Sequence, residues 1–187
     1  IELNQGSQIM TGVSTNKEKV ADDFVPTVNI NSPYIDIWLG LVGSPTDSAN
    51  LVIQTNSSGN PSGTAVHADA TASIAASGIG GGSWIRFTWV NNVSLVSNTT
   101  YWAVLSRTGA GDASNAYRWS TQDGGNSKYF QDSIWSTAAL QTQMIRVYKQ
   151  VSGSSLNDTL IRTLTSTAVL DLREQDAVSF GLYSSRT

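Results

Sequence analysis

Apolar residues alternate with polar ones over short stretches of this chain. Aliphatic residues occupy every second position from Tyr34 to Val42, namely Ile35, Ile37, Leu39 and Leu41. A second stretch runs from Trp84 to Val90, where Ile85, Phe87 and Trp89 share one face. Because successive side chains of a strand point to opposite faces, this period of two predicts strands with one buried face. Asn91 and Asn92 are predicted to end the second strand.

Further apolar stretches are shorter and are separated by turn-forming residues. The stretches cover residues 51–55, 101–105, 117–119, 129–130 and 144–148. The clearest turns are residues 56–63, rich in Gly, Ser and Pro, and residues 122–126. Apolar residues at helical spacing are nearly absent. Many short antiparallel strands without helices are typical of a sandwich or barrel, so we predict an all-β fold, an antiparallel and jelly-roll-like β-sandwich.

The strand pattern predicts one module with two flanking segments. Residues 20–150 are expected to form the sandwich. Residues 1–19 show little periodicity and are predicted to be an arm or an edge strand. Residues 151–187 begin with a Ser- and Gly-rich linker, followed by two extended stretches at 159–172 and 177–183. A segment this short cannot build a core alone, so these strands are expected to pack on the sandwich or on a neighbouring subunit.

Composition excludes several classes of function. Charged residues make up 13% of the chain, against ~25% in average soluble domains. The net charge is -3 and no run of Lys or Arg occurs, so nucleic-acid binding is not expected. No apolar run approaches the roughly 20 residues that span a bilayer, so membrane insertion is not expected. The absence of cysteine excludes disulfides and thiolate metal sites.

Catalytic groups are sparse. His67 is the single histidine, and no Gly-x-Ser-x-Gly segment presents a serine nucleophile to it. The carboxylates show no motif that pairs them for glycoside hydrolysis. Asp112, Asp123 and Asn126 are oxygen ligands suited to calcium, but the EF-hand pattern is absent. We therefore expect no enzyme activity, no cofactor and no metal site.

Aromatic residues are the more informative feature, with six Trp and six Tyr. Trp89 and Trp102 are predicted to fill the core. Six others fall on the opposite strand faces or near loops and are the candidate contacts for a glycan or a protein partner: Trp38, Trp84, Tyr117, Trp119, Tyr129 and Trp135. Exposed aromatic rings stack on sugars and anchor protein interfaces. The alternative is a second hydrophobic layer, or aromatic residues covered by residues 151–187.

A series of segments carries a family resemblance. It includes Leu41-Val42-Gly43, the Gly-Asn-Pro-Ser-Gly turn at 59–63, the strand at 84–89, Thr100-Tyr101-Trp102 and the stretch 145–148. Over roughly residues 20–150 the chain resembles the choice-of-anchor type β-sandwich modules of bacterial surface proteins and bacteriophage virion or tail proteins. The turn at 59–63 and the Thr-Tyr-Trp strand are the most specific parts. The resemblance implies a virion or extracellular location and no catalysis, and it assigns no site.

Two functions are expected on these grounds. The first is a non-catalytic structural or assembly protein of a virus-like particle, a bacteriophage tail, fibre or capsid-surface component. Its partners would be copies of itself, as a homo-oligomer, or other virion subunits. The alternative is a carbohydrate-binding or adhesion module of a secreted bacterial or receptor-binding protein, with a cell-surface glycan as its ligand.

Overall fold

The computed structural model of the chain describes residues 11–13, 17–112, 114–123, 127–138, 141–150 and 159–161. Nearly all of its regular structure is strand. The strands are β1 (Thr11–Val13), β2 (Lys19–Phe24), β3 (Ile30–Val42), β4 (Ser48–Ser57), β5 (Asn60–Ala65), β6 (Thr71–Ala75), β7 (Gly81–Leu95), β8 (Tyr101–Arg107), β9 (Ala116–Trp119), β10 (Thr121–Asp123), β11 (Lys128–Gln131), β12 (Ile134–Thr137), β13 (Gln141–Gln143), β14 (Ile145–Lys149) and β15 (Thr159–Ile161). One 3-10 turn, η1 (Ala76–Gly78), is the helical element of the described residues.

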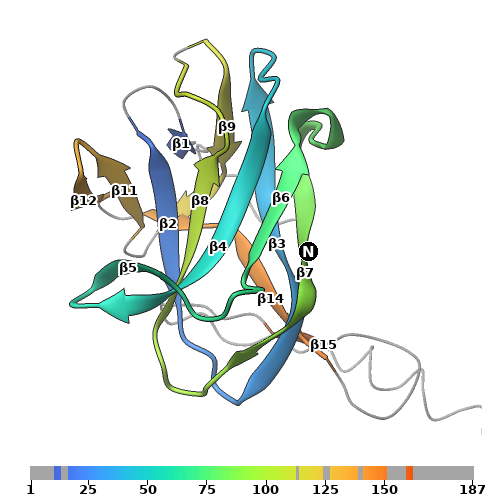
Figure 1. Cartoon of the computed structure of the whole chain (residues 1–187), viewed down its shortest axis with the longest axis vertical. Coiled ribbons are helices and arrows are strands. Elements are labelled where there is room, and N and C mark those ends of the chain that lie inside the picture. The colour runs from blue at the N-terminus through green and yellow to red at the C-terminus, as the bar shows by residue number, and fades with distance from the viewer. Residues whose placement is uncertain are drawn as a thin grey trace, which may run out of the picture.

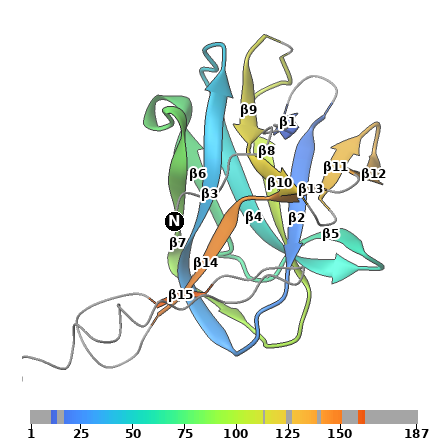
Figure 2. The same ribbon diagram turned by 180° about the vertical axis from the view of Figure 1, so that it is seen from behind.

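These strands form two main antiparallel sheets. The front sheet has the order β12-β11-β2-β8-β4-β5, with β6 also paired to β4 (Figure 1). In the back sheet β3 pairs with β7 along one edge and with both β9 and β14 along the other, and β1 and β15 continue beyond them (Figure 2). Strands β10 and β13 form a separate ribbon. One sheet curls strongly into a half-barrel, and the arrangement is consistent with the predicted β-sandwich.

The connectivity is that of a jelly roll. The order β2-β8-β4-β6 in the front sheet faces the order β14-β3-β7 in the back sheet. Most neighbouring strands in these two orders are distant in sequence, and the chain crosses repeatedly from one sheet to the other, as in the jelly-roll class of double sheets. The all-β, jelly-roll-like prediction is confirmed.

The core lies between the two sheets. Ile35, Ile37 and Leu39 of β3 are fully buried, as the alternation predicts, and they share one cluster with Phe87 of β7 and Ile53 of β4. Burying a large aliphatic or aromatic side chain contributes about 1.5 to 3 kcal/mol, so this layer supplies much of the free energy that holds the sheets together.

The stretch 56–63, expected to be one long turn, is mostly strand. Strand β4 continues to Ser57 and β5 begins at Asn60, so the turn itself contains Ser58 and Gly59 alone. Their φ angles are 50° and 79°, and two successive positive φ angles are typical of the type I′ turn that suits a two-residue hairpin. Pro61 is accommodated because β5 ends this branch of the sheet, where a missing N–H is tolerated.

Strand β7 does not end at Asn91 and Asn92, as predicted, but continues to Leu95. What changes there is its pairing with β3, which skips from Tyr34 opposite Thr88 to Ser32 opposite Val93. Pro33 lies at this skip and has no N–H to donate to a ladder, so the sequence signal marks a bulge rather than a strand end.

The flanking segments each contribute one described strand. Thr11–Val13 pairs with β9, and Thr159–Ile161 pairs with β14. The remaining expectations for residues 1–16 and 151–187 lie outside the described residues, as does most of the turn expected at 122–126, of which Gln122 and Asp123 belong to β10.

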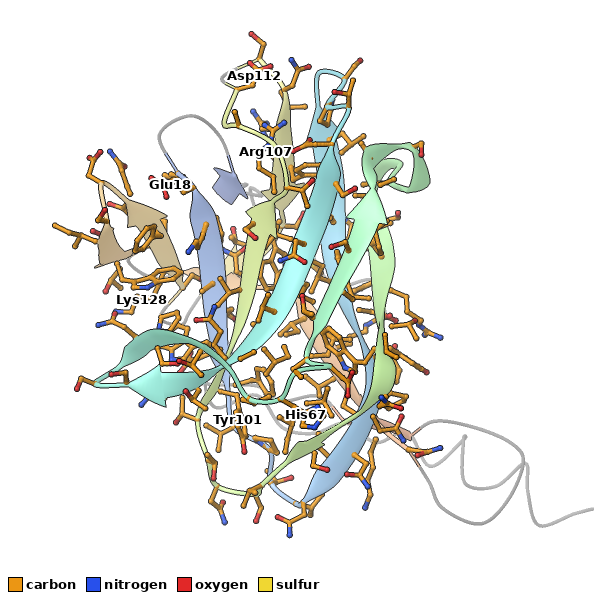
Figure 3. The ribbon with its side chains drawn as sticks, in the orientation of Figure 1. Glu18, His67, Tyr101, Arg107, Asp112 and Lys128 are labelled. Carbon is orange, nitrogen blue, oxygen red and sulfur yellow. The ribbon has the colours of Figure 1, made fainter. Side chains whose placement is uncertain are left out.

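One end of the sandwich is held by a network around Asp47, in the loop before β4. Its carboxylate accepts two hydrogen bonds from Arg107, at 2.8 and 2.9 Å, and one from the backbone N–H of Gly109 at 2.8 Å. The Tyr117 hydroxyl donates to the Asp47 carbonyl at 2.7 Å. Arg107 and Asp112 mark this end in Figure 3. The hydrogen bonds from Arg107 lower the pKa of Asp47 to about 2.

We expect Asp47→Asn to lower stability and to flatten its dependence on acid. The folded pKa of Asp47 lies below the ordinary value of 3.8, so its contribution is present above 3.8 and is lost as the pH falls toward about 2. The contribution is about 1 to 2 kcal/mol. Urea unfolding of both proteins over this pH range measures it. If the free energy of unfolding of the variant fell as steeply with acid as that of the wild type, Asp47 would not be the source of this pH dependence.

A second buried polar cluster surrounds Asp22 of β2, which is 1% exposed. The Ser127 hydroxyl donates to Asp22 Oδ1 at 3.0 Å, and the backbone N–H of Gln143 also bonds to this carboxyl. Asp22 Oδ2 and both amide atoms of the Gln143 side chain have no partner among the described residues. Burial, chiefly, and the neighbouring Asp23 raise the pKa of Asp22 well above its ordinary value.

We expect Asp22→Asn to stabilise the protein increasingly as the pH rises above the ordinary Asp value of 3.8, and to leave stability below that pH nearly unchanged. Because the folded pKa of Asp22 is raised, its contribution is present below the unfolded pKa and is lost as the pH rises through the folded pKa. Asparagine has the shape of the neutral acid and does not ionise. Thermal unfolding across pH tests this, with Asp132→Asn on the exposed β11–β12 turn as the control. Equal destabilisation of Asp22→Asn at every pH would refute it.

Candidate functional site

The outer face of the back sheet carries a group of aromatic and charged side chains. We call it the arginine–tryptophan face, and it comprises Tyr34, Asp36 and Trp38 of β3, Trp84 and Arg86 of β7, Arg118 of β9, and Arg146 and Tyr148 of β14. Strand register brings these residues together: Asp36 lies opposite Arg86 on one side and opposite Arg146 on the other, and Trp38 lies opposite Trp84. Directly opposite residues on one face of a sheet have Cβ atoms about 5 Å apart.

One half of this face is an internally satisfied ion pair. Arg86 donates from Nε to Asp36 Oδ1 at 2.9 Å and from a terminal nitrogen to Oδ2 at 3.2 Å. The same guanidinium stacks on the Tyr34 ring at 3.6 Å, and the Tyr34 and Tyr148 rings lie 4.5 Å apart. Burial and a hydrogen bond to Asp36 raise the pKa of Tyr148. The Asp36 side chain is 8% exposed and the Arg86 side chain is 50% exposed, so the arginine is the solvent-facing member.

The other half is built on two indoles and a second guanidinium. The Trp38 and Trp84 ring centroids are 5.6 Å apart, and their planes meet at 83°, an edge-to-face contact. The Arg146 guanidinium lies 3.7 Å from the Trp84 ring centroid, within cation–π distance. All three side chains are partly exposed. Side chains from three neighbouring strands therefore hold one another in place while each remains accessible to solvent.

The backbone fixes Trp38 at a junction of strands. Its N–H donates to the Met144 carbonyl at 3.2 Å, and its carbonyl accepts from the Ser120 N–H at 2.9 Å. The end of β9 and the start of β14 thus meet on the same edge of β3, beside Trp38. Arg118, which is exposed, lies opposite Gly40 and so projects from the same face.

The face has an excess of positive charge. Three arginines accompany one carboxylate, that of Asp36, which already binds Arg86. Within the described part of the chain, Arg118 and Arg146 form no ion pair. On a chain of net charge -3, this is a local reversal of sign.

Two of the six candidate aromatic residues do not lie at the surface. Tyr117 and Trp119 are fully buried in the core, where Trp119 Nε1 donates to the Met144 carbonyl at 2.9 Å. Because they lie near loops, the sequence predicts both rings at a contact surface. The structure instead buries both side chains. The pairing of β9 with β3 points both rings inward and Arg118 outward. A four-residue strand is too short for its sequence to reveal which face is inner.

The remaining candidates divide between the two sheets. Trp38 and Trp84 belong to the arginine–tryptophan face, whereas Tyr129 and Trp135 lie on the β11–β12 hairpin of the front sheet. Trp135 packs against a small cluster that includes Trp102, and this cluster is separate from the main core. Trp89 is in the core as predicted. The six aromatic residues therefore do not form one platform.

Sequence reasoning missed the arginines and Asp36 as members of the site. The signal was present in the strand parity, because Trp84 and Arg86 alternate on the polar face of β7 in the same way as Arg146 and Tyr148 do on β14. What the sequence lacked was the register that places Asp36 between Arg86 and Arg146.

The groups weighed for catalysis or metal binding are dispersed. The His67 side chain is 57% exposed, and its Nδ1 lies 3.2 Å from both the backbone nitrogen and Oδ2 of Asp69. Asp112 accepts a hydrogen bond from the backbone N–H of Ser114 and contacts the Asn115 side chain. Both carboxylate oxygens of Asp112 are therefore engaged by residues close to it in the chain. The described residues contain no group of three or more His, Asp or Glu side chains placed for a metal ion. The side chains of Asp123 and Asn126 lie outside the described residues.

The chain matches no protein-family model, no curated protein and no solved structure. Within the described residues, no helix has the length and apolar character needed to cross a membrane.

Proposed function

We propose that this chain is a non-catalytic assembly protein of a virus-like particle, a bacteriophage tail, fibre or capsid-surface component. The observation that supports it is the arginine–tryptophan face, a partly exposed array of Trp, Tyr and Arg on a rigid sheet. These residue types dominate the binding energy of protein interfaces. Neighbouring subunits would bury this face against one another.

The geometry suits such a contact because little conformational freedom is left to lose. Trp38 and Trp84 hold each other edge to face, and Arg86 and Arg146 are stacked on rings. Ordering a free, rotamer-rich side chain on binding costs about 0.5 to 1.5 kcal/mol, and a preorganised face avoids most of that. The resemblance of residues 20–150 to choice-of-anchor modules supports the virion or extracellular setting.

A second function, carbohydrate binding in an adhesion or receptor-binding module, is supported by a different observation. Trp38 and Trp84 are partly exposed beside guanidinium groups that form no ion pair with a described residue. Indole rings stack on the C–H faces of sugars while nearby donors bond the hydroxyls.

We expect the protein to form oligomers that depend on Trp38 and Trp84. Light scattering coupled to size exclusion, at several concentrations, measures the mass. Trp38→Ala and Trp84→Ala should each weaken association by roughly 30-fold or more, the size of a hot-spot truncation. Ile134→Ser, which removes a 64% exposed apolar side chain from the front sheet, should leave it unchanged.

Thermal unfolding of each variant separates lost association from lost folding. A wild-type chain that stays monomeric at every concentration would overturn the assembly function. Equal weakening by Ile134→Ser would show that the contact lies elsewhere.

A further inference from the structure

Arg146 differs from Arg86 in its electrostatic surroundings, although both stack on aromatic rings of the same face. Arg86 is neutralised by two hydrogen bonds to Asp36. Arg146 lies opposite Asp36 in register, but no described carboxylate forms an ion pair with it, and its polar neighbour is the neutral Tyr148 hydroxyl. Among the described residues, Arg146 is therefore the member of this pair that has no ion-pair partner.

The contact with Trp84 limits the directions from which Arg146 can bind a ligand. The guanidinium carbon Cζ lies 3.7 Å from the centre of the Trp84 ring, so the indole covers one side of the group and leaves N–H groups that it does not engage. A guanidinium presents these donors as a planar fork that matches the two oxygens of a carboxylate. The cation–π contact holds that fork at a defined place on the sheet.

The surroundings of Arg146 favour an anion that also carries an apolar face. Trp38 is edge to face with Trp84 and is partly exposed, so apolar ring surface adjoins the cation. Arg118 projects from the same face on the neighbouring strand and adds positive charge without an ion-pair partner among the described residues. A pyranose with a ring carboxylate has both features: C–H groups for indole and a carboxylate for guanidinium.

We propose that Arg146, Trp84 and Trp38 form a binding site for a carboxylated saccharide, of the uronic-acid class. The carboxylate would accept two hydrogen bonds from Arg146, and the sugar ring would lie against the exposed parts of the two indoles. This inference rests on the second proposed function, carbohydrate binding, and names the chemical class of its ligand.

Titration calorimetry with polygalacturonate oligosaccharides and with their carboxyl-reduced, neutral counterparts tests the site in the full chain. We expect binding of the acidic oligosaccharides that weakens as salt is added, and at least tenfold weaker binding of the neutral ones. Arg146→Gln and Trp84→Ala should each reduce acidic binding at least tenfold. Arg146→Lys should restore only part of it, because an ammonium lacks the planar fork.

A charge-matched control is Lys128→Gln on β11 of the front sheet, where the Lys128 ammonium bonds Thr137. It removes the same charge as Arg146→Gln, but on the other sheet, and should leave binding unchanged. An equal loss in Lys128→Gln would show non-specific attraction of a polyanion and would overturn the proposal.

Three other outcomes would also overturn it, and they separate it from the broader function. Equal binding of the neutral oligosaccharides would leave carbohydrate binding in place and refute the acidic class. No binding of either oligosaccharide would refute both carbohydrate binding and the acidic class of ligand. The assembly function would still be decided by the mass measurements. Binding of polyglutamate as tight as that of polygalacturonate would show recognition of carboxylates on a peptide rather than a saccharide.

Discussion

The pairing of β3 along both of its edges is the constraint on which the rest of the structure depends. Strand β7 covers one edge, and β9 and β14 share the other. Because side chains of a strand alternate, this single strand supplies Ile35 and Ile37 to the core and Asp36 and Trp38 to the outer face. A shift of one residue in its register would exchange these two sets, so the burial of the aliphatic residues also fixes the position of the arginine–tryptophan face.

Local patterns predicted the strands well where they are long and one-sided. Ile35, Ile37 and Leu39 are buried as their spacing indicates, and Phe87 and Trp89 follow the same rule on β7. Prediction failed where local signals have two physical meanings. Turn-forming residues around Ser58 and Gly59 suit either a long loop or a tight hairpin, and consecutive asparagines suit either a strand end or a bulge.

The sequence predicted the aromatic members of the site, Trp38 and Trp84, but not its charged members. Trp38 and Trp84 could be placed on the polar face of their strands from parity alone. The ion pair of Asp36 with Arg86, and the lack of a described ion-pair partner for Arg146, depend on which strands become neighbours. Residues 36, 86 and 146 are far apart in the chain. Tyr117 and Trp119 were misplaced because a short strand gives too few positions to establish which face is buried.

The jelly-roll order of the strands also affects how the chain folds during its synthesis. The edge of β3 at Ile35 to Ile37 is completed by Ile145 to Val147 of β14, among the last described strands. Until that stretch has left the ribosome, the nascent chain exposes unpaired N–H and C=O groups beside a wholly apolar strand face, a template for wrong pairing. We therefore expect productive folding to wait for nearly the whole sandwich, with final steps that are long-range and slow.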